Sequence, residues 1–153
     1  MLYLAGRSAV AIAAYNKFQD FVEQLGLAVH NLNTATLSVY LSNATPSASL
    51  DAVRADLAEI ANGNGYTTGG IDTQNTWAEA AGTGTLTGTK AVWTAAGGSM
   101  AAFQYVVLFN DTAASDPLIA WWDYGSALTL LVGETFTVKF NSGDPTGTIL
   151  TIA

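Results

Sequence analysis

The sequence predicts a mainly β protein: a single antiparallel β-sandwich or jelly-roll-like domain with one short helix and an N-terminal arm. Short runs rich in β-branched and aromatic residues alternate apolar with polar side chains, as half-buried strands do. Gly, Asn and Pro signals such as NATPS, NGNG and NSGDPTG separate these runs at short intervals. The length of 153 residues suits one domain. We expect the arm at residues 1–14 and the sandwich domain at residues 15–153.

The predicted strands follow one another along the chain. TLSVYL (36–41) places Leu37, Val39 and Leu41 on one face, and ETFTVKF (134–140) alternates apolar with polar in the same way. The uncharged stretch 91–110 is interrupted by Gly97-Gly98-Ser99, so we interpret it as two strands and a turn and not as a membrane span. The remaining expected strands are LIAWWDYGSALTL (118–130) and the closing TGTILTIA (146–153).

Two segments have helical spacing instead. SLDAVRADLAEIANG places apolar residues three or four positions apart, with Ser49 as a possible N-cap and Gly63 after the end, so the sequence predicts a short helix there. Residues 17–32 also carry apolar residues at helical spacing. Gly26 and the β-branched neighbours, however, leave helix and strand both open for that segment.

The composition excludes several classes of partner. Only 11% of the residues are charged, and twelve acidic residues against five basic ones give a formal charge of -7. The five basic residues are scattered, so no stretch follows a nucleic-acid backbone, and an anionic membrane would repel the chain. With no cysteine, disulfides and thiolate metal sites are excluded. The apolar N-terminus lacks the basic start of a signal peptide.

No combination of residues predicts catalysis or a cofactor. His30 is the only histidine, and no serine stands in a G-x-S-x-G motif. The glycines of GNGYTTGG (63–70) miss the spacing and the lysine of a phosphate-binding loop. Positive-φ turn positions explain these glycines better. We therefore predict a protein that is not an enzyme and has no cofactor and no metal.

The pair Trp121-Trp122 is the most informative local feature. Neighbouring side chains of a strand point to opposite faces, so one ring can enter a core while the other needs a second apolar surface. That surface is either a neighbouring subunit, since Trp and Tyr are favoured at interfaces, or a loop or arm that covers the strand. Trp121, Trp122 and Tyr124 are therefore interface candidates.

Several long blocks resemble small virion structural proteins of tailed bacteriophages. The most specific is FNDTAASDPLIAWWDYG (109–125), and the similarity extends from about Tyr15 to Ile152. The resemblance implies a β-rich protein without a catalytic motif, with a capsid cement or decoration subunit as the leading role. A tail, neck or fibre component is the alternative, followed by a carbohydrate-binding surface module in which a tryptophan stacks on sugar.

The resemblance also implies partners and a location. These are the major capsid protein and further copies of the chain, with a trimer as one arrangement, in a capsid assembled in the host cytoplasm. The segment 1–14 lies outside the similarity and carries Arg7 as its only charge. We expect this apolar arm to pack on a neighbouring chain, which adds Leu2, Tyr3 and Leu4 to the interface candidates.

Overall fold

A computed structural model describes residues 2–6, 9–141 and 143–153, with side chains from residue 12 onward. Antiparallel strands dominate the chain. The strands are β1 (Leu2–Gly6), β2 (Ala9–Ala13), β3 (Asn16–Lys17), β4 (Leu37–Ser42), β5 (Ile71–Asp72), β6 (Thr76–Ala80), β7 (Thr83–Thr89), β8 (Ala91–Thr94), β9 (Phe103–Asn110), β10 (Leu118–Leu128), β11 (Thr135–Phe140) and β12 (Thr146–Ile152). The predicted mainly β class with antiparallel sheets is confirmed.

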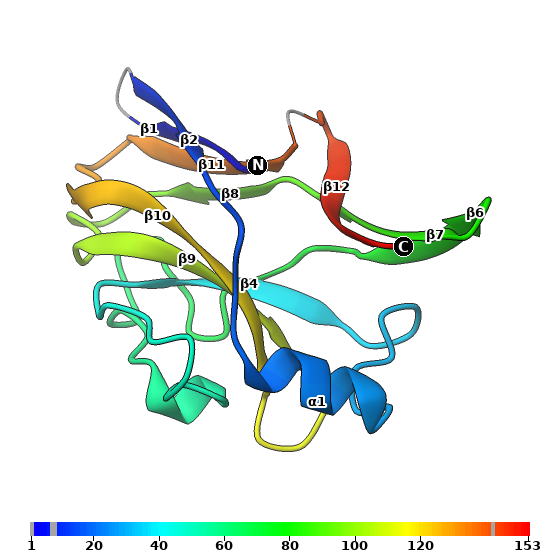
Figure 1. The fold of residues 1–153 in the computed structure, drawn as a ribbon. Helices are drawn as coiled ribbons and strands as arrows, with labels where there is room; N and C mark the ends of the chain where they lie inside the picture. Colours follow the sequence, from blue (N-terminus) through cyan, green and yellow to red (C-terminus); the bar gives the residue numbers. More distant parts are fainter. Residues whose placement is uncertain (1, 7–8, 142) are drawn as a thin grey trace.

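Three sheets make up the fold. A four-stranded sheet has the order β2-β1-β11-β8, and a five-stranded sheet has the order β3-β10-β9-β4-β5. Figure 1 shows these two as layers, one above the other, in a sandwich-like arrangement. A three-stranded sheet, β12-β7-β6, extends to one side of the layers. The jelly-roll part of the expectation stays a prediction.

The main core fills the space between the two larger sheets. In β11, Phe136, Val138 and Phe140 are buried while the intervening residues are partly exposed, which confirms the alternation of ETFTVKF. Phe103 of β9 lies across the core from Phe136, with ring centroids 4.8 Å apart at a steep angle. Aromatic rings in such edge-to-face contact add to the stabilisation from burial alone.

The outer face of the five-stranded sheet is covered as well. A second apolar cluster gathers Tyr40, Val107 and Leu118 with Phe18 and Leu57, which come from segments outside that sheet. The Tyr40 hydroxyl donates to the Leu57 carbonyl at 3.1 Å, which ties the covering segment to the sheet. β4 is accordingly buried at all six positions.

The predicted helix at 49–63 is wrong. Only a 3₁₀ turn, Arg54–Asp56, forms there. The Asp56 carboxylate accepts hydrogen bonds from the backbone of Ala52 and Val53, and Val53 is extended and bridges to Pro117. The Asp56 carboxylate caps the start of this short turn. The bridge from the extended Val53 to Pro117 keeps the preceding residues out of helical geometry.

The α-helix lies instead in the segment that was left open. α1 spans Asp20–Gly26, with Asp20 and Glu23 in its first turn, where the helix dipole favours acidic groups. Phe21 is buried and Val22 is 54% exposed, so the helix covers the core with one face and presents the other to solvent. It is the only α-helix of the described residues.

The N-terminal segment pairs within its own chain. β1 is antiparallel to β11 over five positions, from Leu2 opposite Phe140 to Gly6 opposite Phe136. β2 pairs with the other edge of β1. The backbone of this segment is therefore part of the sandwich. Its packing on a neighbouring chain, and the separation of an arm at residues 1–14, stay predictions.

Candidate functional site: a groove beside an open sheet edge

β12 forms an open edge of the three-stranded sheet. Within the described part of the chain it pairs with β7 alone. Its sequence, TGTILTI, contains no charge and no proline. Natural edge strands are usually protected by charge, proline, shortness or a bulge. Of these features β12 has the irregularity between Thr148 and Leu150. The residues after it, 150–152, pair with β7 on one side and have no strand partner on the other among the described residues.

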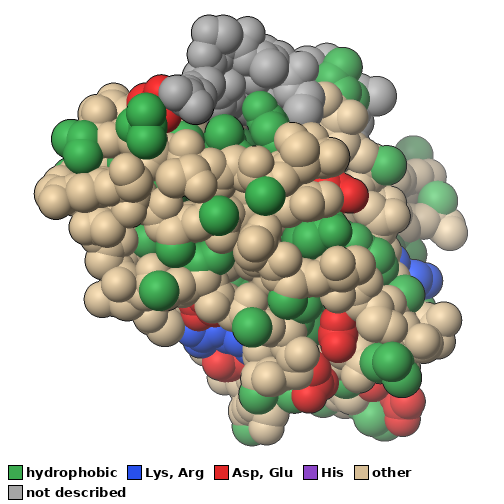
Figure 2. All heavy atoms as spheres, turned by 90° about the vertical axis from the view of Figure 1, so that its left-hand side faces the viewer, with side chains coloured by type: hydrophobic (Ala, Val, Ile, Leu, Met, Phe, Trp, Pro, Cys, Tyr) green, Lys and Arg blue, Asp and Glu red, His purple; other side chains and the backbone are tan. Residues whose placement is uncertain are grey.

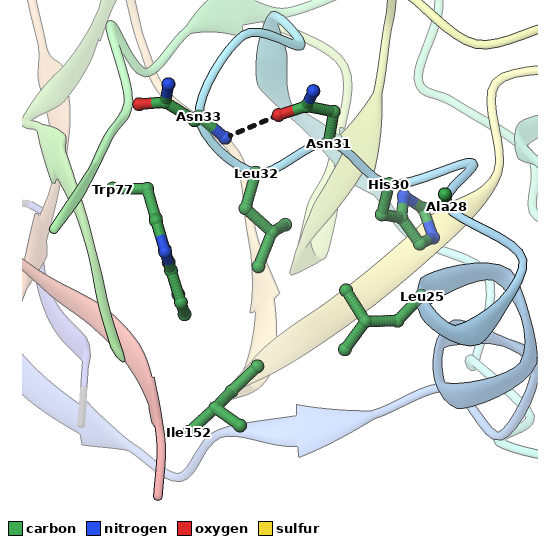
Figure 3. Close-up of a pocket in the computed structure, with 8 residues that line it drawn as sticks. All are labelled: Leu25, Ala28, His30, Asn31, Leu32, Asn33, Trp77 and Ile152. Atoms are coloured by element: carbon green, nitrogen blue, oxygen red, sulfur yellow. Dashed lines mark hydrogen bonds between the residues drawn. The ribbon is translucent and has the colours of Figure 1, made fainter. Parts of the chain in front are cut away.

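An apolar hollow lies next to the end of this strand. Leu25, Leu32, Trp77 and Ile152 line a space of about 350 Å³, together with polar residues of the loop 30–33. Figure 3 shows these four side chains converging from different elements: α1, the following loop, β6 and β12. Mostly apolar hollows with a few polar groups are typical of binding sites.

Trp77 owes its position in the hollow to a glycine. A Cβ atom at Gly84 would lie 2.1 Å from the Trp77 ring, a distance that real Cβ atoms do not show. Gly84 belongs to β7, the strand that pairs with β6. The missing side chain at Gly84 therefore leaves room for the indole, which Figure 3 shows among the residues that line the hollow.

A second hollow continues the first along α1. Tyr15, Phe21, Val22 and Leu150 line about 390 Å³ of space together with Leu25 and Ile152, the two residues that both hollows share. We call the two hollows together the α1–β12 groove. Figure 1 shows α1 below the C-terminal end of β12.

Lys17 is the charged residue that lines this groove. Of the other described basic residues, Arg54 pairs with Glu59 and Asp116, while Lys90 and Lys139 both pair with Asp144. Lys17 is exposed and has no ion pair within 4 Å among the described residues. Figure 2 presents another side of the molecule, the left-hand side of Figure 1, where charged side chains are few among hydrophobic and uncharged ones.

His30 lines the first hollow with a buried ring. The Asn110 amide lies 3.2 Å from Nδ1 and, as the donor, leaves the proton of the neutral imidazole on Nε2. Nε2 has no hydrogen-bond partner among the described residues. Burial lowers the pKa of His30 from 6.5 to about 4, against the opposing effect of Asp20. His30 is therefore neutral at pH 7.

We expect His30 to make the fold sensitive to mild acid. Its pKa is lower in the folded than in the unfolded chain, so its contribution is complete above pH 6.5 and is lost as the pH falls toward 4. A shift of this size corresponds to about 3 kcal/mol. Urea unfolding between pH 7 and 4 measures the loss. His30→Gln, which does not titrate there, should have a distinctly flatter profile. Identical profiles would contradict the assignment.

A charged cluster around Arg54, on the face of β4 opposite the main core, consists of charges that pair with one another. The Arg54 guanidinium contacts Glu59 at 2.6 Å and Asp116 at 3.2 Å, and it lies 5.0 Å from the Phe109 ring centroid. Glu59 also accepts hydrogen bonds from the Tyr66 hydroxyl at 2.5 Å and from the backbone N–H of Gly69. A hollow of about 500 Å³ adjoins the cluster. Every charge here has a partner, which indicates a role in holding the loops to the sheet.

We predict that Glu59→Gln lowers the free energy of unfolding by about 2 kcal/mol, because it leaves a partly buried guanidinium facing an amide N–H₂. Glu59 is only 12% exposed at its side chain. Asp144→Asn, which breaks the exposed pairs with Lys90 and Lys139, is the control and should have a much smaller effect. Urea unfolding at pH 7 compares the two. Equal losses would show that burial of the Arg54 cluster does not matter.

The structure separates the interface candidates of the sequence. Trp122 is 1% exposed in the main core, whereas Trp121 is partly exposed and packs on Phe18 with centroids 4.6 Å apart. The prediction of one ring in the core and one against a covering segment is confirmed, and the covering segment belongs to the same chain. Tyr124 is partly buried against Phe136. The side chains of Leu2, Tyr3 and Leu4 lie outside the described residues.

The groove residues were not among the sequence candidates. Trp77 stands in a polar context, TQNTWAEA, and Ile152 lies more than seventy residues away in the chain. Their meeting depends on the pairing of β6 and β12 with β7. The detectable signal was the uncharged, proline-free run TGTILTI, which is unusual for an edge strand.

Comparison with protein-family models, curated proteins and solved structures finds no match to this chain. Among the described residues, no group of three or more His, Cys, Asp or Glu side chains could hold a metal ion. The helix found in that part of the chain is too short to cross a membrane. The geometry of the groove and the sheet edge therefore carries the functional argument.

Proposed function

We propose that this protein is a non-enzymatic structural component of a tailed-phage virion, a cement or decoration subunit that binds neighbouring coat subunits of the head. The observation that carries the proposal is the uncharged open edge of β12 beside an apolar groove. Such a surface suits contact with another protein chain. The resemblance of residues 15–152 to phage virion proteins supports the same role.

The chemistry of the described side chains supports a binding role over a catalytic one. His30 is buried and neutral, and the Arg54 cluster is fully paired. A cement subunit stabilises a shell by binding only the assembled state, which shifts the equilibrium toward assembly. It needs contact surface and no reactive group. A tail, neck or fibre component would need the same kind of surface and remains the alternative.

The test separates purified phage particles into heads and tails and quantifies this protein in each fraction by mass spectrometry. We expect it with the heads, in a fixed ratio to the coat protein. Heads stripped of it should lose their contents at a lower temperature and recover when it is added back. Its presence in tails alone would favour the alternative, and its absence from both would overturn a virion role.

A further inference from the structure

We propose that the α1–β12 groove binds an extended segment of a coat subunit, which adds to β12 as a further strand and places an acidic side chain on Lys17. The inference deepens the proposed function by naming the partner's conformation and charge. In the identity of that partner it rests on the proposed function. The mode of binding rests on the groove alone.

Among the edge strands, β12 offers the most suitable backbone for the addition of a further strand. The five-stranded sheet ends on both sides in strands of two residues, β3 and β5, which offer little to pair with. β6, at the other edge of the small sheet, carries the charge of Glu79. The four-stranded sheet ends in β2 and β8, uncharged edges of five and four residues. β12, with seven residues, is the longest edge strand of the described residues that has neither charge nor proline. Strand addition there would satisfy backbone groups that otherwise face solvent, which is the source of affinity in this mode of recognition.

The two hollows of the groove are suited to accept alternate side chains of an added strand. Alternate residues of an added strand point to the same side, so an apolar residue at every second position can enter neighbouring pockets. The groove offers two such pockets, which meet at Leu25 and Ile152. Val22 borders the second hollow and is 54% exposed, so the described residues cover only part of its apolar surface. The occupant is therefore extended and apolar at alternate positions.

The charge of Lys17 favours a different protein over a second copy of this chain as the partner. Symmetric pairing of two copies would bring β12 against β12, and no residue of this strand is acidic. Asp144, two residues before the strand, already pairs with Lys90 and Lys139. Lys17 has no ion pair within 4 Å among the described residues. A segment of a different protein that carries Asp or Glu would form an ion pair with Lys17 in the groove. Charge complementarity of this kind selects partners more than it adds affinity.

The direct test uses synthetic ten-residue peptides in which Val alternates with Thr and one Thr is replaced by Asp, Asn or Lys. We expect the Asp peptide to bind about tenfold more tightly than the Lys peptide, and Lys17→Glu to reverse that order. Amide hydrogen exchange should show new protection in β12. An N-methylated Asp peptide, which lacks the backbone donors, should not bind. Absence of new protection in β12 with every peptide would overturn the proposal.

Two variants locate the binding surface. Ile152→Lys puts a charge on the edge strand inside the groove and should weaken Asp-peptide binding at least about tenfold. Val92→Lys is the matched control, since Val92 is 43% and Ile152 39% exposed and both lie in edge strands. Equal weakening by both variants would overturn the assignment to the groove. So would a dimer of the wild-type chain that Ile152→Lys dissociates, because the occupant would then be a second copy.

The partner itself is tested on particles. A photoreactive benzoylphenylalanine in place of Val22 should cross-link, on irradiated heads, to an extended coat segment containing Asp or Glu. A cross-link to a second copy, to a coat helix or to nothing would contradict the proposed partner. If the protein is absent from heads, the proposed function fails, while the peptide experiment still decides whether the groove accepts a strand.

Discussion

Trp122→Ala should lower the free energy of unfolding by about 3–5 kcal/mol, because it removes the largest fully buried side chain of the core and leaves a cavity in its place. The indole lies between Tyr15 and Phe140, with ring centroids 5.7 and 5.8 Å away. Phe140 belongs to β11 and Trp122 to β10, so the ring joins the two larger sheets. Its loss would leave a cavity across that interface.

The matched control is the neighbouring residue. Trp121→Ala removes the same side chain from the other face, where it is partly exposed against Phe18. We expect a loss of about 1–2 kcal/mol, since less apolar area leaves water there on folding. Urea unfolding followed by far-ultraviolet circular dichroism avoids the change in fluorescence. A larger loss for Trp121 than for Trp122 would mean that the two faces are assigned the wrong way round.

The sequence was sufficient for those parts of the fold that depend on alternation. The strands around Val39, Phe103 and Phe136 lie where the pattern predicted them, and Trp121 and Trp122 divide between two apolar clusters. Alternation is a local property that neighbouring residues decide. The positive φ of Gly63, Gly65, Gly69 and Gly70 likewise agrees with their interpretation as turn residues.

The helices show where local patterns fail. Residues 49–63 have helical spacing, yet Leu50 is 80% exposed and Val53 is extended. The contacts that decide against a helix are long-range: Val53 bridges to Pro117, and Arg54 reaches Asp116. Tertiary contacts override local propensity in such cases. No spacing rule would have revealed these partners.

The candidate groove was beyond prediction for the same reason. It is made where α1, β6 and β12 meet, and the sequence left α1 undecided between helix and strand. The sheet order that places β12 and β6 on either side of β7 is a property of the whole fold. What the sequence did indicate was the uncharged C-terminal run TGTILTI, which forms one side of the groove.

A substitution of Gly70, in the tight loop before β5, should also cause a large loss of stability. Gly70 has a φ of +71°, and a Cβ atom on it would lie 1.9 Å from the carbonyl oxygen of Val39. Val39 lies in β4, which is hydrogen-bonded on both sides, to β9 and to β5. The strand therefore cannot move away without breaking its ladders. The glycine is required by close approach as well as by its backbone angle.

Gly70→Ala should consequently lower the free energy of unfolding by about 4 kcal/mol or more, at the upper end of single substitutions. Gly69→Ala is the control, because Gly69 also has a positive φ, of +98°, but its Cβ would meet nothing closer than Arg54 at 4.0 Å. It should cost only the backbone strain, about 1–2 kcal/mol. Urea unfolding of both variants at pH 7 gives the difference. If Gly70→Ala fails to fold, the intermediate loss in Gly69→Ala still shows that strain alone does not account for it. Equal losses in the two variants would show that β4 yields to the added methyl group, and that the loop and the sheet are less tightly joined than their contacts indicate.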